Sequence, residues 1–432
     1  MTTIGPAPTE VTIFLYNVGF GDCLLLRLEY PRGRNRSVLI DFGSTRRAKQ
    51  GAPKSMEDVA RKIEEHSAGK LDVVVATHRH RDHISGFAGD SGKIISNLDP
   101  EVVVQPWTEQ PDLAVDATDS TVPAAGSSRL QFAARLESLH AAAAQVLEQL
   151  PRLAGTPGVT ASLVRQLEFL GQTNLKNAEA VRALQAMGTR HAYASFGSDL
   201  GLADLLPGVE VEVLGPPSLA QSPEIRSMAS TNSDEFWHLA ATGGQAPSRQ
   251  RAEPLFPDAR QARKIPQEAR WLIPRIDKMQ AEELLSLVRI LDGVMNNTSL
   301  ILLFTIGDTR LLFPGDAQLE NWRYALQRAP NAEDIRSRLS QTRVYKVGHH
   351  GSLNATPRTL LWNGFVRAGL PDPAQQLITL LSTRASTHGD SDQGTEVPRD
   401  RLVEELKTHS RLVNTQDCTA ESGWWREVVV PL

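Results

Sequence analysis

The chain has 432 residues, of which 41% are hydrophobic and 22% charged, and its formal net charge is −4. Such a composition is typical of a folded globular protein and argues against the disordered, fibrous and membrane-spanning classes. The mild acidity provides no bulk attraction to nucleic acid, although metal ions bound in a site supply the local positive charge that phosphates require.

The first residues contain neither the basic nor the apolar stretch of a secretory signal, and we expect a cytoplasmic protein. The longest apolar runs, such as Leu300 to Phe304, are as long as a strand and far too short to cross a membrane. Two cysteines, Cys23 and Cys418, do not make a disulfide framework. We expect two reduced thiols, while a single bond between them stays open.

Hydrophobic periodicity predicts strands mixed with a helix in the N-terminal part of the chain. An apolar hairpin precedes a third strand, a polar helix and an apolar run that leads into a histidine-rich loop. Short buried strands mixed with helices indicate an α/β layered sandwich. The predicted strands are 11–16, 23–28, 37–40, 71–76 and 101–105, and the predicted helix is 55–67.

The loop after residues 71–76 carries four potential metal ligands within six positions: His78, His80, Asp82 and His83. Because the whole chain has only 11 histidines, a chance cluster on a solvated turn is an improbable explanation. Neutral imidazole suits zinc and other first-row ions, and a carboxylate suits a second or harder ion. In extended chain His78 and His80 point the same way, so one short loop can serve two neighbouring ions.

Two insertions interrupt the predicted sheet. Residues 108–207 are rich in Ala, Ser and Gln with apolar residues at helical spacing, which predicts a helical insertion. A core strand follows at 208–217. Residues 218–296 are polar and broken by prolines, which predicts an irregular insertion, either a lid or a surface excursion. The core would then consist of residues 1–107, 208–217 and 297–432.

Every predicted strand of the C-terminal part delivers a polar or ligand-type residue at its end. Asp316 follows one strand, His349 and His350 follow the next, and His388 follows the penultimate strand. Ligands gathered from distant strand ends onto one edge of a layered fold are the expected architecture of a metal-hydrolase site.

With these motifs the chain resembles the metallo-β-lactamase-fold metallo-hydrolases, and most closely the hydrolase domain of ComEC-type competence proteins. The resemblance implies a four-layer αββα sandwich with a binuclear metal site between two sheets. It covers about residues 11–107, 208–217 and 297–395, and neither insertion. The matching segments are Val18 to Asp22, Leu39 to Gly43, Thr77 to Gly86, Val211 to Pro217, Asn297 to Leu300, Leu312 to Asp316 and Gly348 to Ser352.

The resemblance also implies roles for individual residues. His78 and His80 would bind one ion, Asp82 and His83 the other, and Asp316 would bridge both. His388 is favoured as the last histidine ligand, with His349 or His350 as the alternative.

Behind the ligands, Asp41 resembles the family's buried acid, which orients a ligand or its loop. Many members carry a further histidine ligand where this chain has Asn296 and Asn297. Asparagine is a poor zinc ligand, and its carbonyl oxygen suits a harder ion such as manganese. We therefore expect two divalent ions, Zn²⁺ or Mn²⁺, with Asn297 close to the ligands but not among them.

The expected chemistry is hydrolysis by a hydroxide held between two metal ions. Asp82 would hold or deprotonate that water, and His349 or His350 would stabilise or protonate the leaving oxygen. An aspartate at the bridging position gives nitrogen and oxygen ligands only, which suits a phosphodiesterase or nuclease acting on nucleic acid or nucleotides. Two alternatives stay open: a lactone, ester or thioester hydrolase, and a metal-stabilised binding or regulatory module that recruits a protein partner through its insertions.

Overall fold

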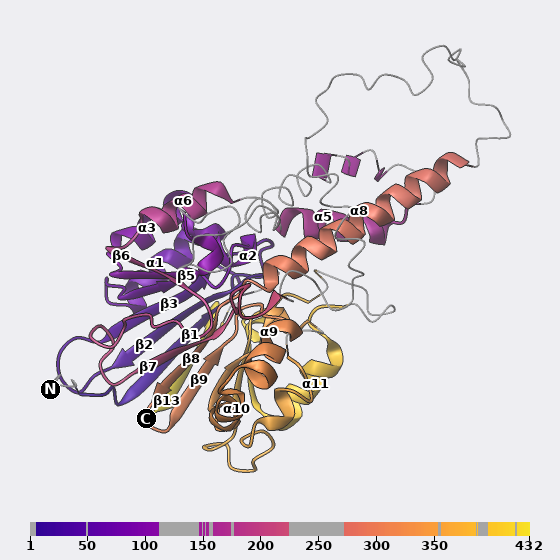
Figure 1. Cartoon of the computed structure of the whole chain (residues 1–432). Helices are drawn as coiled ribbons and strands as arrows, with labels where there is room; N and C mark the ends of the chain where they lie inside the picture. The colour runs from indigo at the N-terminus through magenta and orange to yellow at the C-terminus, as the bar shows by residue number, and fades with distance from the viewer. Residues whose placement is uncertain are drawn as a thin grey trace.

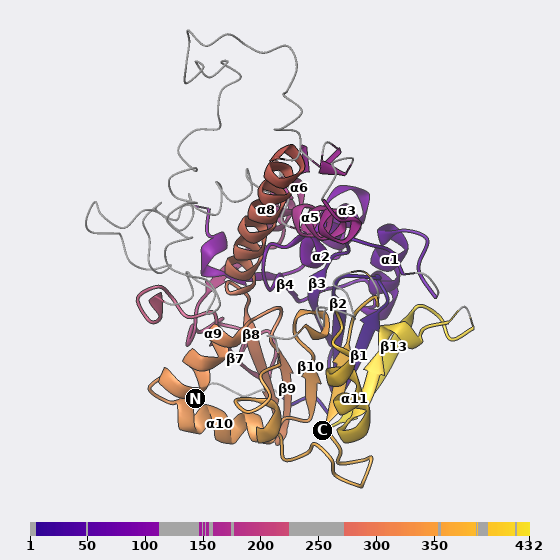
Figure 2. The same cartoon turned by 90° about the vertical axis from the view of Figure 1, so that its right-hand side faces the viewer.

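The computed structural model describes residues 6–48, 51–111, 147–148, 150–151, 153–154, 159–173, 177–223, 272–352, 356–385, 387, 396–419 and 421–432. These residues form a mixed α/β fold with two mixed β-sheets and helices on their outer faces (Figures 1 and 2).

The first sheet has seven strands in the order β13-β1-β2-β3-β4-β5-β6. Its strands β13, β1, β2 and β3 pair antiparallel, whereas β3, β4, β5 and β6 pair parallel. The bounds are β1 Glu10–Tyr16, β2 Cys23–Glu29, β3 Arg36–Phe42, β4 Val73–Val75, β5 Val102–Pro106, β6 Arg190–Ala194 and β13 Trp425–Pro431.

The second sheet has six strands in the order β12-β11-β10-β9-β8-β7. Here β9, β10, β11 and β12 pair parallel, and β7, β8 and β9 pair antiparallel. Because parallel strands end at the same edge of a sheet, the loops after β9, β10 and β11 are brought together. The bounds are β7 Glu210–Gly215, β8 Ile301–Ile306, β9 Thr309–Phe313, β10 Val344–Lys346, β11 Ile378–Leu381 and β12 Arg411–Asn414.

One buried apolar cluster joins the two sheets. Val11, Ile13 and Leu15 of β1 belong to it, as do Leu302 and Phe304 of β8. Residues at alternate positions of a strand face the same side, so each sheet turns one apolar face toward this cluster. The sheets therefore pack face to face through a single core.

The outer faces of the sheets carry helices. On the first sheet α1 (Met56–His66), α3 (Gly89–Asn97) and α6 (Ala178–Ala186) contribute to a second apolar cluster, and on the second sheet α9 (Leu319–Arg323), α10 (Ala332–Ser340) and α11 (Asp400–His409) contribute to a third. Short elements complete the core: α2 Arg81–Ile84, η1 Ser85–Phe87, η2 Trp107–Glu109, η5 Tyr324–Arg328, η6 His349–Gly351, η7 Trp362–Gly364 and η8 Thr415–Asp417.

Helices of the two insertions pack against each other. Leu163 and Leu167 of α5 (Ala161–Thr173) share an apolar cluster with Leu285 of α8 (Leu272–Asn296). The same cluster contains Phe20, from the turn between β1 and β2. Figure 1 shows α8 running from beside the sheets outward, along α5.

The insertions differ from the sequence prediction in two ways. Residues 272–296, predicted to be irregular, form one 25-residue helix. Pro274 does not break it because it lies in the first turn, where no intrahelical N–H bond is needed. The strand β6 falls within the predicted helical insertion 108–207 but pairs with β5, so the core resumes before residue 208. Residues 112–146 of the predicted helical insertion lie outside the described residues.

Two further sequence expectations concern membranes and cysteines. None of the described helices is both long and apolar enough to cross a membrane. Cys23 and Cys418 are both free and buried, so no disulfide joins them.

Candidate metal centre

The predicted ligands meet where strands of both sheets end. The histidine loop follows β4, Asp316 follows β9, and His350 lies beyond β10. The residues His78, His80, Asp82, His83, Asp316 and His350 are all at most 2% exposed. Three overlapping groups drawn from these residues and Asp22 could each hold a metal ion, because within a group the ligand atoms lie within 4.8 Å of one another.

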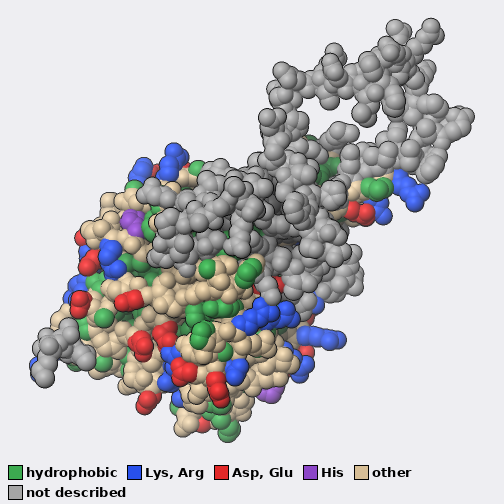
Figure 3. Space-filling model, in the orientation of Figure 1, with side chains coloured by type: hydrophobic (Ala, Val, Ile, Leu, Met, Phe, Trp, Pro, Cys, Tyr) green, Lys and Arg blue, Asp and Glu red, His purple; other side chains and the backbone are tan. Residues whose placement is uncertain are grey.

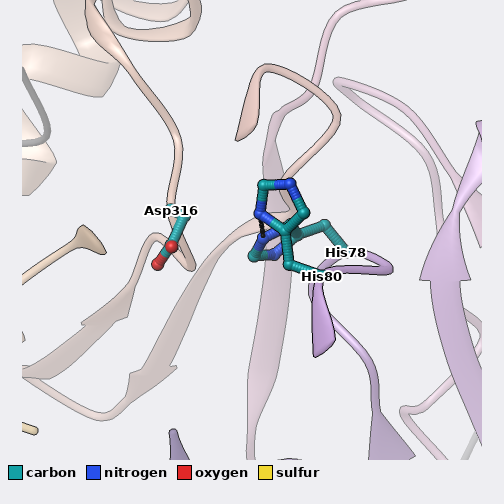
Figure 4. A group of neighbouring side chains, drawn as sticks. All are labelled: His78, His80 and Asp316. Carbon is teal, nitrogen blue, oxygen red and sulfur yellow. Dashed lines mark hydrogen bonds between the residues drawn. The ribbon is translucent and has the colours of Figure 1, made fainter. Parts of the chain in front are cut away.

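The first group consists of His78, His80 and Asp316. His78 Nε2 lies 2.9 Å from His80 Nδ1. Figure 4 shows the two imidazoles next to each other on one loop, with Asp316 beside them on a separate loop. Two nitrogens and one oxygen thus converge from sequence positions more than 230 residues apart.

The second group consists of Asp82, His83 and His350. His350 Nε2 lies 3.0 Å from Asp82 Oδ2, and His350 Nδ1 donates to the carbonyl oxygen of Ser382 at 3.0 Å. That bond leaves Nε2 of His350 as the nitrogen with a lone pair directed at the group.

A third group, Asp22, His83 and Asp316, connects the other two. Asp316 is shared with the first group and His83 with the second. His83 Nε2 lies 3.2 Å from Asp316 Oδ2. The three groups therefore form one continuous buried cluster.

Asp41 supports the cluster from behind. Its carboxylate accepts hydrogen bonds from the Thr77 backbone nitrogen at 2.7 Å and the Thr77 hydroxyl at 2.8 Å, and it lies 2.7 Å from His83 Nδ1. Asp41 also has a φ of 55°, a left-handed conformation that is costly outside glycine. Since Asp41 binds the Nδ1–H of His83, Nε2 of His83 is left to face Asp316.

Two glycines let the loops approach closely. A side chain on Gly43 would come within 2.5 Å of the backbone of Asp82 and His83, and one on Gly21 within 2.7 Å of the Asp82 carbonyl oxygen. The Asp22 backbone nitrogen donates to that same carbonyl at 3.0 Å. The glycines of the motifs thereby bring the ends of β1 and β3 against α2.

The histidines of the cluster differ in the direction in which their pKa values are shifted. Burial, together with the charges of His83 and His80, holds the pKa of His78 well below its usual range. Burial also opposes charge on His83, but Asp316 and Asp41 outweigh it and raise the pKa of His83 well above its usual range. Conversely, burial would raise the pKa of Asp316, but the charges of His83 and His349 outweigh it and lower that pKa strongly.

His349 and His350 have consecutive left-handed conformations, with φ of 43° and 51°. This turn sends the two rings in different directions. His350 is fully buried, whereas the side chain of His349 is 21% exposed. His349 Nδ1 lies 2.8 Å from the Ser352 hydroxyl, and its Nε2 lies 3.9 Å from Asp316 Oδ2. His349 is therefore the histidine of the pair that a bound molecule can reach.

The cluster leaves polar atoms unsatisfied. Asp22 Oδ1, Asp82 Oδ1 and His83 Nε2 are buried and form no hydrogen bond with the described residues. Each such group costs about 1–3 kcal/mol of desolvation. Asp41, Asp82 and Asp316 have only histidines within ion-pair distance in the described part of the chain. Cations bound among these oxygens and lone pairs would satisfy both the atoms and the charge, so the donor set fits a metal.

Several neighbours of the cluster were not assigned a role from the sequence. Lys346, inside the buried strand β10, forms an ion pair with Asp22. A lysine within a buried strand needs a buried anion, which was an available signal. Asp292 of α8 lies 3.9 Å from His80 Nε2, a contact no sequence pattern indicated.

Three predicted residues need comment. Asn297 bonds Asn321 of α9 at 3.3 Å instead of contacting a ligand, and its neighbour Asn296 faces the cluster with Nδ2 3.5 Å from His349 Nε2. His388 lies outside the described residues.

No protein-family model and no curated protein matches this chain.

Proposed function

We propose that the protein is a metal-dependent hydrolase of phosphodiesters, a phosphodiesterase or nuclease, that works with two divalent ions, Zn²⁺ or Mn²⁺. The observation that carries the proposal is the continuous buried cluster in which Asp316 and His83 each belong to two ligand groups. We further propose that the two face-to-face sheets and their outer helices are a four-layer αββα sandwich of the metallo-β-lactamase kind, similar to the ComEC-type hydrolase domain.

The proposed ligands follow from the geometry. His78 and His80 would hold one ion, Asp82, His83 and His350 the other, and Asp316 would lie between them. When bound, two such ions lower the pKa of a water molecule and polarise a phosphoryl oxygen. His350 takes the ligand position because its Nδ1 is bonded to a carbonyl and its Nε2 points to Asp82.

The remaining residues would act on the substrate. His349 is the exposed member of the histidine pair, and burial lowers its pKa, although Asp316 and Asp292 oppose this. A histidine at this position can donate a proton to, or hydrogen-bond, a leaving oxygen. Asp82, whose Oδ1 has no hydrogen-bond partner among the described residues, would orient the attacking water.

Two arginines lie in the chain segment next to the β1–β2 turn. Arg46 and Arg47 line a cavity of about 190 Å³ whose lining includes none of the proposed ligands. The Arg46 carbonyl accepts a hydrogen bond from Phe20, whose ring lies 4.3 Å from that of His350. On the face drawn in Figure 3, Lys and Arg side chains alternate with Asp and Glu, so attraction of a phosphodiester would be local. A cytoplasmic location belongs to the same proposal, since two buried free cysteines suit a reducing compartment.

The test combines metal analysis with activity. Protein purified without chelator is analysed for bound metal and assayed with Zn²⁺, Mn²⁺ and Mg²⁺ on single- and double-stranded nucleic acid and on bis-p-nitrophenyl phosphate. Hydrolysis that His80→Ala reduces by about 10²-fold or more would support the proposal. His191→Ala, on β6, is the matched control and should retain activity.

Two other outcomes would replace the proposal. Turnover of lactones, esters or thioesters without phosphodiester cleavage would assign the same site to acyl chemistry. Bound metal without turnover of any substrate, together with a stable protein complex, would make the chain a binding or regulatory module.

A further inference from the structure

Each core histidine of the cluster has its second ring nitrogen beside an acceptor from the core. His78 Nδ1 lies 3.2 Å from the Thr77 hydroxyl oxygen, and His83 Nδ1 lies 2.7 Å from Asp41. His350 Nδ1 donates to the Ser382 carbonyl at 3.0 Å. Such acceptors fix the tautomer and the ring orientation of metal-binding histidines.

His80 differs, because the carboxylate within ion-pair distance of its outer nitrogen comes from an insertion. His80 Nδ1 faces His78 Nε2, so its Nε2 is the nitrogen that points out of the first group. The carboxylate oxygen Oδ1 of Asp292 lies 3.9 Å from that Nε2. Asp292 belongs to α8, the helix of the second insertion.

Asn296 holds Asp292 in this direction. The two residues are one helical turn apart, and Asn296 Nδ2 donates to the other carboxylate oxygen, Oδ2, at 3.2 Å. The same amide group lies 3.5 Å from His349 Nε2. Asn296 is fully buried, and its Oδ1 forms no hydrogen bond with the described residues. The last turn of α8 is thus built into the site.

We infer that Asp292 is a positioning residue for His80, through which the docking of helix α8 controls how tightly the ion at His78 and His80 is held. The inference rests on the proposed metal site and goes beyond it, because it assigns the second insertion a function. Linkage makes the effect reciprocal: an ion that binds better when α8 is docked also stabilises the docked helix.

The first experiment measures binding, not activity. Chelator-stripped protein is titrated calorimetrically with Mn²⁺ and with Zn²⁺. Loss of an acceptor behind a histidine ligand typically weakens metal binding by about 10- to 100-fold. We expect Asp292→Ala to weaken the lower-affinity ion by this factor and leave the other ion unchanged. Asp292→Glu, which keeps the carboxylate, should recover part of the affinity.

A matched control lies on the same helix. Glu282 is exposed and pairs with Lys278 at 3.6 Å, away from the cluster. Glu282→Gln should bind both ions as the wild type does. Melting temperatures of the metal-free variants identify any variant that fails to fold, and Asp292→Asn, nearly isosteric, replaces Asp292→Ala in that case.

The second experiment tests the coupling to α8. Hydrogen exchange of residues 285–296 should slow when metal is added to the wild type and should not respond in Asp292→Ala. Unchanged affinity for both ions in Asp292→Ala and Asp292→Asn would overturn the inference while leaving the proposed function intact. A wild type that binds no ion would overturn both.

Discussion

The two halves of the candidate metal cluster differ in where the support of their histidines comes from. In the half made of Asp82, His83 and His350, the second ring nitrogens of the two histidines face Asp41 and the Ser382 carbonyl, which belong to the core. The other half, His78, His80 and Asp316, has one histidine whose outer nitrogen faces Asp292 on an insertion helix. Since a long helix can shift more easily than a buried strand end, we expect the half with Asp82, His83 and His350 to hold an ion more tightly than the half with His78 and His80.

The most damaging change to this arrangement should be at Asp316, which belongs to the half with His78 and His80 and lies 3.2 Å from His83 of the other half. Asp316→Ala removes a carboxylate from two ligand groups and leaves His83 Nε2 without its neighbour. Loss of one member of a buried charged network costs about 3–5 kcal/mol, or about 10²- to 10⁴-fold in affinity or rate. We expect less than one bound ion per chain by metal analysis. Retention of both ions would contradict the shared position of Asp316.

The next largest effect should come from Lys346, whose partner Asp22 lies beside His83 and His350. This residue and Asp22 form a buried ion pair whose side chains are at most 3% exposed. Lys346→Met removes the lysine partner of Asp22 and leaves this buried carboxylate with the imidazoles of His83 and His350, each 3.8 Å away. It should lower the free energy of unfolding of metal-free protein by up to about 3–5 kcal/mol in urea denaturation.

The control for Lys346 is Lys93, which is 76% exposed and pairs with Asp90. Lys93→Met should leave the free energy of unfolding close to that of the wild type, because the pair is solvated. The double variant Asp22→Asn/Lys346→Met should be more stable than Lys346→Met alone. Equal effects of the two lysine substitutions would show that the buried pair is not special.

A smaller effect should come from His66, which belongs to neither half. Its ring stacks on Phe14 at 4.0 Å and lies 2.9 Å from the Tyr16 hydroxyl through Nδ1. Burial, with Lys62 next, lowers the pKa of His66 to about 4. Because the folded-state pKa is below the unfolded value of about 6.5, the unfolded chain binds the proton first and stability falls as pH drops from 6.5 toward 4.

Half exposure limits the size of this effect to about 1 kcal/mol after screening by solvent. His66→Phe keeps the stacking and removes the titration, so its stability should fall less than that of the wild type between pH 7 and pH 4.5 in urea denaturation. Identical pH profiles would contradict the assignment. Added metal should not alter the difference between the two proteins.

The parts of the fold that sequence could predict are those with local signals. Apolar runs predicted β1, β2 and β8, and the polar segment 55–67 predicted α1, which begins with a capping box of Ser55 and Asp58. The strand β6 was missed because Arg190–Ala194 is only partly buried and has no apolar alternation. Helix α8 was missed because the prolines in residues 218–296 predicted an irregular segment.

The candidate site, like the fold, could be predicted only where the sequence carries a local signal. The histidine loop and Asp316 were recognisable because ligand-type residues follow apolar runs. Asp292 lies on a helical face among ordinary charged residues, and its distance from His80 depends on how α8 docks, which no local pattern encodes. Similarly, no local pattern shows which of the two neighbouring asparagines faces the cluster. The direction of the chain at the end of α8 turns Asn296 toward His349 and Asn297 toward Asn321.

The most direct test of two separately supported metal sites is a metal titration of chelator-stripped wild-type protein, followed by calorimetry and metal analysis. We expect two ions per chain with unequal affinities, the weaker one lost in His80→Ala and the tighter one in His83→Ala. A single ion, or two ions that both variants weaken equally, would contradict a cluster whose halves are supported separately.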